Sequence, residues 1–139
     1  MTLTYRLTDQ HDGDVADLGR RLDGYNSAHV APSQKRRLSI LARDDATGLI
    51  AGLSGETAWG WLYIRWLWVD SAYWRQGIAG SLLDRAEAEA KERGCVGAHI
   101  DTFNPTAVAV YKRQGYDVYG EIPGYVAGQA RTYLQKRWA

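Results

Sequence analysis

Apolar and polar residues alternate with two different periods along the chain, and the two periods separate strands from helices. Period-two alternation predicts strands over residues 3–7, 38–45, 48–57, 59–70, 96–103, 116–122 and 130–138. Apolar positions at helical spacing predict helices over residues 14–26, 78–93 and 105–114. The order β-α-β-β-β-α-β-α-β-β contains no repeat or linker, so we expect a single domain over residues 1–139.

The stretch over residues 59–70 is apolar on both faces, which is typical of a strand at the centre of a sheet. Strict alternation places one set of apolar side chains on one face: Leu62, Ile64, Trp66 and Trp68. The opposite face then holds a second set: Trp61, Tyr63, Leu67 and Val69. Arg65 is the exception, so its side chain must reach water, a charged partner or a ligand. We expect a right-handed parallel crossover from this strand to residues 96–103.

Charge and cysteine content exclude several classes of function. Lys and Arg number 17 against 16 Asp and Glu, so no charge excess indicates a nucleic acid or a membrane as partner. The short basic cluster Lys35–Arg37 is interpreted as a solvated loop. Cys95 is the one cysteine, which excludes an intrachain disulfide and a cysteine-rich metal site. No apolar run suits a signal segment or a membrane span, so we expect a cytoplasmic protein.

A turn rich in small residues connects the central strand to the second helix. Gly77, Ala79 and Gly80 stand where this helix begins, although glycine costs about 1 kcal/mol relative to alanine inside a helix. The unpaired N–H groups of a helix start attract anions, and small side chains allow a phosphate to approach them. Close packing of the helix on the sheet would favour the same residues, so both interpretations remain open. The turn lacks the sequence of a Walker loop and that of a dinucleotide-binding fold.

Two motifs together resemble the signatures of a known family. Residues 69–83 read VDSAYWRQGIAGSLL, and residues 104–116 read NPTAVAVYKRQGY. The first resembles the Arg/Gln-x-x-Gly-x-Gly/Ala turn of the GNAT N-acetyltransferase superfamily, and the second resembles its Asn-x-x-Ala-x-x-x-Tyr-x-x-x-Gly-Phe/Tyr signature. The resemblance extends to the order of the elements and is greatest to compact bacterial members. Trp74 departs from it, because it holds the position of the leading Arg or Gln, and Arg75 follows one residue later.

This resemblance implies a fold and a donor substrate. The fold would be α/β (α+β), with a mixed, mostly antiparallel central sheet, a central parallel strand pair and flanking helices. Acetyl-CoA would be the co-substrate, and no metal would be needed. The chain would be a transferase, more narrowly an acyltransferase.

The resemblance also assigns the contacts of acetyl-CoA. The main chain of Leu67 and Val69 would pair with the pantetheine arm, and an N–H near Trp68 or Val69 would polarise the thioester carbonyl. Residues 76–81 would bind the pyrophosphate, with Arg75 supplying a side chain from a shifted position. The implied cofactor-binding residues are Leu67, Trp68, Val69, Arg75, Gln76, Gly77, Ile78, Ala79, Gly80, Ser81, Asn104 and Tyr111.

Acid and base candidates complete the expected site. Tyr111 is the candidate acid for the leaving thiolate, because a phenol has a proton to donate. Glu56 is the candidate base, acting directly or through water, since the strand over residues 61–69 has no carboxylate or histidine. Three other candidates for the base stay open: His29, His99 and Asp101. Arg65 is a candidate for orienting an acidic group on the acceptor, which would indicate a zwitterionic amine.

The expected function is transfer of an acetyl group from acetyl-CoA to a primary amine, on either a small molecule or a protein. The amine would attack directly in a ternary complex, because no cysteine is placed to carry the acyl group. The alternative is a non-catalytic acyl-CoA-binding module of the same fold. A homodimer is left open, with Trp59 as a candidate for a dimer contact or for the lining of an acceptor pocket.

Overall fold

A computed structural model describes residues 1–139 and divides them into two compact units, residues 1–33 and residues 34–139. The first unit holds helix α1 (Gly13–His29), which Asp12 caps by accepting hydrogen bonds from the backbone N–H groups of Asp14 and Val15. No residue of α1 is buried, although its apolar residues repeat at helical spacing. Residues 3–7 do not form the predicted strand. Their alternation indicated a strand, but no ladder partner satisfies their backbone groups.

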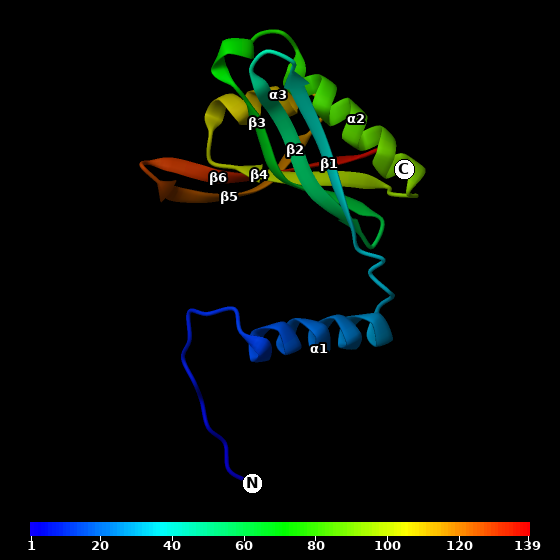
Figure 1. Cartoon of the computed structure of the whole chain (residues 1–139), viewed down its shortest axis with the longest axis vertical. Helices are drawn as coiled ribbons and strands as arrows, with labels where there is room; N and C mark the ends of the chain where they lie inside the picture. The colour runs from blue at the N-terminus through cyan, green and yellow to red at the C-terminus, as the bar shows by residue number, and fades with distance from the viewer. The chain divides into compact units, whose positions relative to one another are not determined.

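The second unit is a mixed sheet with two helices (Figure 1). Its strands and helices are β1 (Arg36–Asp44), β2 (Gly48–Ala58), β3 (Trp61–Val69), α2 (Ile78–Glu92), β4 (Gly97–Thr102), α3 (Pro105–Arg113), β5 (Asp117–Val126) and β6 (Gln129–Arg137). The strands lie in the order β1-β2-β3-β4-β6-β5. Only β3 and β4 run parallel, which confirms the predicted fold class.

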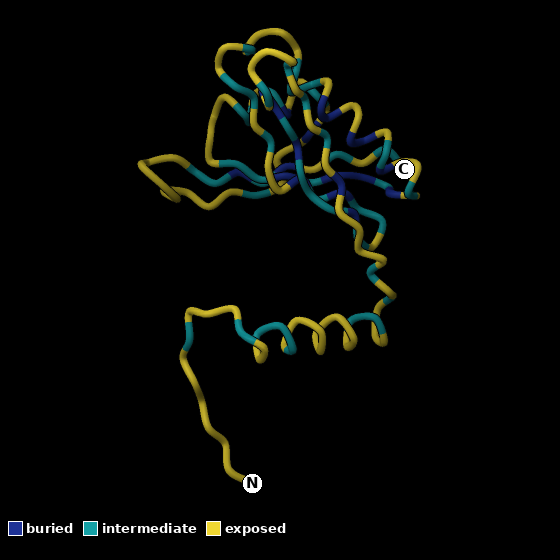
Figure 2. Tube along the Cα trace, in the orientation of Figure 1, coloured by how far each residue is buried: buried dark blue, intermediate teal, exposed yellow.

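One hydrophobic core lies between the sheet and the two helices. Leu62, Ile100 and Leu134 project from the sheet into the same cluster as Leu83 of α2 and Tyr111 of α3. The buried segments accordingly gather between the sheet and these helices (Figure 2). Because side chains alternate along a strand, the residues between these core positions project from the opposite face, which neither α2 nor α3 covers.

A β-bulge divides β3 into two halves, and the alternation of side chains between the two faces of the sheet is reversed from one half to the other. The register against β2 passes from Gly55↔Ile64 to Ser54↔Trp66, so Arg65 is an extra residue on β3. The bulge brings the two backbones so close that a Cβ on Gly55 would overlap the carbonyl oxygen of Tyr63. After the bulge, Trp66 and Trp68 are exposed, while Leu67 and Val69 pack against the core. The expectation that Trp66 and Trp68 share a face with Leu62 was therefore wrong.

The basic cluster Lys35–Arg37 does not form the predicted solvated loop. Arg36 and Arg37 begin β1, and Lys35 immediately precedes the strand. The side chain of Arg93, near the end of α2, donates hydrogen bonds to the carbonyl oxygens of Arg36 at 3.5 Å and Arg37 at 3.1 Å. These bonds fix the backbone at the start of β1.

Candidate active site

The parallel pairing of β3 with β4 is short, and it ends in the middle of β3. It joins Trp61–Ile64 to Gly97–Ile100. Beyond Ile64, β3 continues to Val69 with β2 as its one ladder partner, through pairs such as Leu53↔Leu67 and Ala51↔Val69. The edge of Leu67–Val69 that faces away from β2 therefore has no strand beside it. A free strand edge of this kind can form a ladder with an extended ligand, as the resemblance implies for pantetheine.

No side chain caps the N-terminus of α2. Its N-cap is Gly77, and no side chain accepts a hydrogen bond from the first amides. The first intrahelical bond runs from the N–H of Ser81 to the carbonyl of Gly77 at 3.0 Å, so the amides of residues 78–80 precede the hydrogen-bonded ladder. Such donors, together with the positive end of the helix dipole, suit an anion. The turn thus fits a pyrophosphate, as the resemblance implies.

The two glycines of this turn, Gly77 and Gly80, have different surroundings. A Cβ on Gly77 would meet no atom within 4 Å, so the surface there is open to a ligand. A Cβ on Gly80 would lie 2.5 Å from the side-chain nitrogen of Gln114, at the end of α3. Gly80 therefore serves the close packing of α2 against the end of α3, and Gly77 leaves space outside. Gly77 also has a φ of 75°, a left-handed conformation that favours glycine whether or not a ligand binds.

Trp74 has a structural role at its unusual position. Its indole N–H donates a hydrogen bond to the carbonyl oxygen of Val69 at 2.9 Å. That bond joins the turn to the last residue of β3 and occupies a carbonyl at the edge expected to bind pantetheine. Arg75 is exposed and has a positive φ of 64°, so its side chain lies outside the packed turn.

Tyr111 on α3 is buried, but its hydroxyl is not enclosed. No protein group forms a hydrogen bond with this hydroxyl, and every fully buried side-chain nitrogen or oxygen has a hydrogen-bond partner, so the hydroxyl reaches the surface. Burial, reinforced by the Asp101 carboxylate, raises the pKa of Tyr111 to about 12. The phenol is therefore protonated throughout the neutral pH range. Asn104 caps α3, its side-chain oxygen accepting a hydrogen bond from the N–H of Thr106 at 2.9 Å.

A buried ion pair holds α3 in place relative to α2 and β6. Glu87 on α2 accepts hydrogen bonds from the hydroxyl of Tyr116 at 2.9 Å and the ammonium of Lys136 at 2.7 Å. Lys136 also donates to the backbone carbonyl of Gln114 at 2.9 Å. These bonds fix the C-terminal end of the helix that carries Tyr111.

On the opposite face of the sheet, two candidate bases, Glu56 and His99, form one row with Tyr63 between them. Glu56 is the register partner of Tyr63, and Tyr63 is the register partner of His99. The rings of Tyr63 and His99 stack with centroids 4.9 Å apart. The fold therefore brings Glu56 and His99 to the two sides of Tyr63, next to the point where β3 and β4 separate.

The carboxylate of Glu56 is already engaged by two cations. Its Oε2 lies 2.9 Å from the ammonium of Lys35, and its Oε1 lies 2.8 Å from the guanidinium of Arg65. The Lys35 hydrogen bond, and after it the Arg65 one, lowers the pKa of Glu56 below its ordinary value of 4.5. A carboxylate with a lowered pKa is a poor proton acceptor at neutral pH. The geometry therefore argues against Glu56 as the base.

Asp101 is engaged in the same way. One oxygen accepts hydrogen bonds from Nη2 and Nε of Arg131 at 2.6 and 3.0 Å, and the other accepts one from the Tyr63 hydroxyl at 3.2 Å. Arg131 in turn lies between the rings of Tyr125 and Tyr133, 5.2 and 5.5 Å from their centroids. Asp101 is thus a structural partner that fixes Tyr63 and Arg131.

His99 has free ring nitrogens. It is half-buried, and neither nitrogen forms a hydrogen bond with the protein, so both reach the surface by the same reasoning as the Tyr111 hydroxyl. Burial lowers the pKa of His99 below its ordinary value of 6.5, an effect that the Asp101 carboxylate partly opposes. The imidazole is therefore neutral at pH 7 and has a lone pair to accept a proton. His29 is different, because its Nδ1 lies 2.8 Å from the carbonyl of Tyr25 within α1.

Sequence reasoning missed Arg131 and the contact of Trp74. Arg131 could have been found from its alternation with Thr132 and Leu134 on β6, because those two residues face the core and Arg131 does not. The pairing of β6 with β4 depends on tertiary structure that alternation does not reveal. No group of three or more potential metal ligands lies together, and none of the helices is both long and apolar enough to cross a membrane. Cys95 is buried, and burial raises the pKa of its thiol.

Comparison with known proteins identifies the family. Residues 8–116 match the model of the acetyltransferase (GNAT) family. An acetyltransferase of Agrobacterium fabrum, Atu2258, is 42% identical over 98% of this chain and 100% of its own length. A blasticidin-S acetyltransferase of Streptomyces morookaense is 40% identical over 63% of this chain and 65% of its own length. The chain therefore belongs to the GNAT acetyltransferase family, which confirms the resemblance of its two motifs.

Solved structures agree with this assignment. The crystal structure of an acetyltransferase from Agrobacterium tumefaciens is 43% identical, with a TM-score of 0.89 over 97% of this chain and 99% of that chain. A streptothricin acetyltransferase from Bacillus anthracis, solved in complex with acetyl coenzyme A, shares the fold at 21% identity, with a TM-score of 0.65 over 74% of this chain and 63% of that one.

Proposed function

We propose that the protein transfers the acetyl group of acetyl-CoA to a primary amine by direct attack in a ternary complex. One observation carries the proposal. The free edge of β3 and the uncapped start of α2 lie at the two ends of the turn that follows β3. Tyr111, with its surface-reaching hydroxyl, interacts electrostatically with Asp101, which directly follows the end of the β3–β4 pairing at Ile100. Membership of the GNAT family supports acetyl-CoA as the donor. Burial of Cys95 supports direct attack, because a buried thiol of raised pKa does not carry an acyl group readily.

In this proposal, the donor binds through backbone groups. The free edge at Leu67–Val69 pairs with the pantetheine arm, and an N–H there polarises the thioester carbonyl. The turn over residues 76–81 binds the pyrophosphate, with the amides of residues 78–80 as its donors, and Arg75 adds a positive charge outside the turn. Asn104 uses its side-chain oxygen for capping, and its side-chain amide group is free to contact the donor.

Tyr111 stabilises the departing sulfur. The amine nitrogen forms a bond to the thioester carbon, the carbon–sulfur bond breaks, and the sulfur leaves as a thiolate that needs a proton. The pKa of about 12 for Tyr111 exceeds the roughly 8.5 typical of a thiol. Complete proton transfer from the phenol is therefore uphill, and its main contribution is a hydrogen bond to the sulfur as negative charge develops. The thiolate then takes its proton from solvent as CoA leaves.

His99 accepts the proton that the attacking nitrogen loses. Of the candidate bases on this face, Glu56 and Asp101 are held by cations, while His99 is neutral with free nitrogens. Glu56, the base expected from sequence, instead holds Lys35 and Arg65 in place. In this proposal His99 provides the base, and Tyr111 provides the hydrogen-bond donor for the departing sulfur.

The donor site is tested by the substitution Ala79→Glu. A carboxylate at the second position of α2 would repel a bound pyrophosphate and block its approach to the amides. We expect the Kd for CoA, measured by calorimetry, to rise at least about tenfold. Ala88→Glu is the matched control. Ala88 is exposed on the same helix, so this substitution adds the same charge away from the turn. Equal affinities of Ala79→Glu and Ala88→Glu would show that the pyrophosphate does not bind at this turn.

A further inference from the structure

We propose that the acceptor amine also carries a carboxylate, and that Lys35 and Arg65 bind this carboxylate during the reaction. The inference rests on the proposed acetyl transfer and names its substrate class: small amino-acid-like molecules with an amine and a carboxylate separated by a few bonds. It concerns the acceptor alone, so it can fail while the donor site and the transfer chemistry stand.

The first observation is an excess of positive charge. A single carboxylate, that of Glu56, lies between the ammonium of Lys35 at 2.9 Å and the guanidinium of Arg65 at 2.8 Å. One positive charge of this trio is left without a partner. Arg37, the register partner of Glu56 on β1, is also exposed and adds to the excess. Asp101, on the same face, does not compensate the excess, because it is paired with Arg131.

The second observation is that these cations still have donors to offer. The side chains of Lys35 and Arg65 are 64% and 50% exposed, whereas that of Glu56 is 16% exposed. An ammonium has three N–H donors and a guanidinium has five, and each of these side chains uses one within the protein. A guanidinium and an ammonium each form charge-assisted hydrogen bonds with a carboxylate, and the guanidinium can do so through two N–H groups at once.

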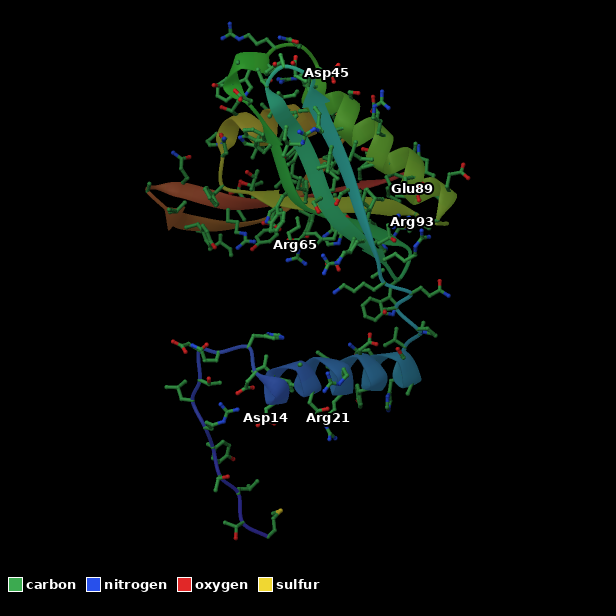
Figure 3. The ribbon with its side chains drawn as sticks, in the orientation of Figure 1. Asp14, Arg21, Asp45, Arg65, Glu89 and Arg93 are labelled. Atoms are coloured by element: carbon green, nitrogen blue, oxygen red, sulfur yellow. The ribbon has the colours of Figure 1, made fainter.

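The third observation is that the fold holds the two cations in defined positions. Arg65 is the extra residue of the bulge in β3, and its guanidinium lies over the ring of Tyr63, 5.2 Å from the centroid. Figure 3 shows Arg65 on the side of the sheet away from α2. Lys35 immediately precedes β1, and the side chain of Arg93 donates hydrogen bonds to the backbone carbonyls at the start of that strand. Figure 3 shows Arg93 and Glu89 near the end of α2. Positioned cations lose less entropy on binding than mobile ones.

The distance to the proposed base suits a short bifunctional molecule. Glu56, Tyr63 and His99 occupy one row on adjacent strands, which places the backbones of Glu56 and His99 about 10 Å apart. The long side chain of Arg65 shortens this span. An amine beside His99 and a carboxylate beside Arg65 can therefore belong to the same small molecule.

The test uses matched pairs of acceptors that differ only in charge. Glycine, β-alanine and 4-aminobutyrate are each compared with the corresponding carboxamide, and release of free CoA from acetyl-CoA gives kcat and KM. We expect the wild-type protein to prefer at least one carboxylate over its amide by about tenfold or more in kcat/KM. In the double variant Lys35→Met, Arg65→Met, this preference should fall to about one, mainly through a higher KM for the carboxylate.

The controls separate this inference from a general loss of activity. The double variant should keep the wild-type Kd for CoA, because neither cation is among the residues assigned to the donor, and Arg43→Met, at the far end of β1, should keep the carboxylate preference. A wild-type protein that acetylates amides and carboxylates equally, or a double variant that keeps the preference, would overturn the carboxylate inference and leave acetyl transfer intact. A wild-type protein that binds CoA but acetylates none of these amines would overturn the proposed function and this inference together.

Discussion

Tyr111→Phe is expected to lower kcat by about 100-fold while leaving the thermal stability and the Kd for CoA nearly unchanged. The substitution removes only the hydroxyl, which forms no hydrogen bond with the protein, and it keeps the buried ring in the core. The departing sulfur then has no donor in place, so its negative charge develops without stabilisation. Steady-state kinetics and thermal unfolding of the same preparation measure both effects.

Tyr116→Phe is the matched control for this result. The hydroxyl of Tyr116 donates to the buried carboxylate of Glu87 at 2.9 Å, so its loss leaves a buried acceptor with one partner fewer. We expect about 1–3 kcal/mol of lost stability and a much smaller change in kcat than for Tyr111→Phe. If Tyr111→Phe lowered the stability and left kcat intact, Tyr111 would be a core residue without a catalytic role.

His99→Gln is expected to lower kcat by about 100-fold and to remove the acidic limb of its pH profile. Burial lowers the pKa of His99 below 6.5, so the imidazole is neutral above this pKa and protonated below it. Only the neutral form accepts a proton. The wild-type kcat, measured with both substrates saturating, should therefore be level near neutral pH and fall as the pH decreases through the pKa of His99.

The substitution Glu56→Gln distinguishes the two candidate bases. It should keep the acidic limb, because the carboxylate of Glu56 is bound to Lys35 and Arg65, and its effect on kcat should be less than about tenfold. An acidic limb that persists in His99→Gln and disappears in Glu56→Gln would reverse the assignment and make Glu56 the base.

Sequence patterns predicted most of the fold because alternation and turn signals are local properties. The sheet, α2 and α3 follow from apolar periodicity, and Asn104 followed by Pro105 marked the start of α3 correctly. The bulge at Arg65 could not be predicted, since it depends on how β3 pairs with β2. The bulge places Trp66 and Trp68 on the face opposite to Leu62 and Ile64, whereas alternation alone had placed all four on one face.

The sequence predicted residues for the proposed donor site more easily than residues for the proposed acceptor site, and the reason is physical. Residues 76–81, the proposed pyrophosphate site, are contiguous and would act through their backbone, so a short motif is enough to indicate them. The proposed acceptor face consists of residues from the start of β1 and from three other strands: Lys35, Glu56, Arg65 and His99. Only the three-dimensional structure shows that the carboxylate of Glu56 is paired with two cations and that the ring nitrogens of His99 form no hydrogen bond with the protein. Ion pairs and hydrogen bonds between residues distant in sequence leave no local pattern.

The most direct test of acetyl transfer follows the acetyl group itself. The wild-type protein is mixed with acetyl-CoA labelled with ¹³C in the acetyl group and with a panel of amino acids and simple amines, and the products are identified by mass spectrometry. We predict an N-acetylated amine that carries the label and forms in equal amount with free CoA. If CoA binds to the protein in calorimetry and no labelled amine forms, the chain is an acyl-CoA-binding module without catalytic activity, and acetyl transfer is contradicted.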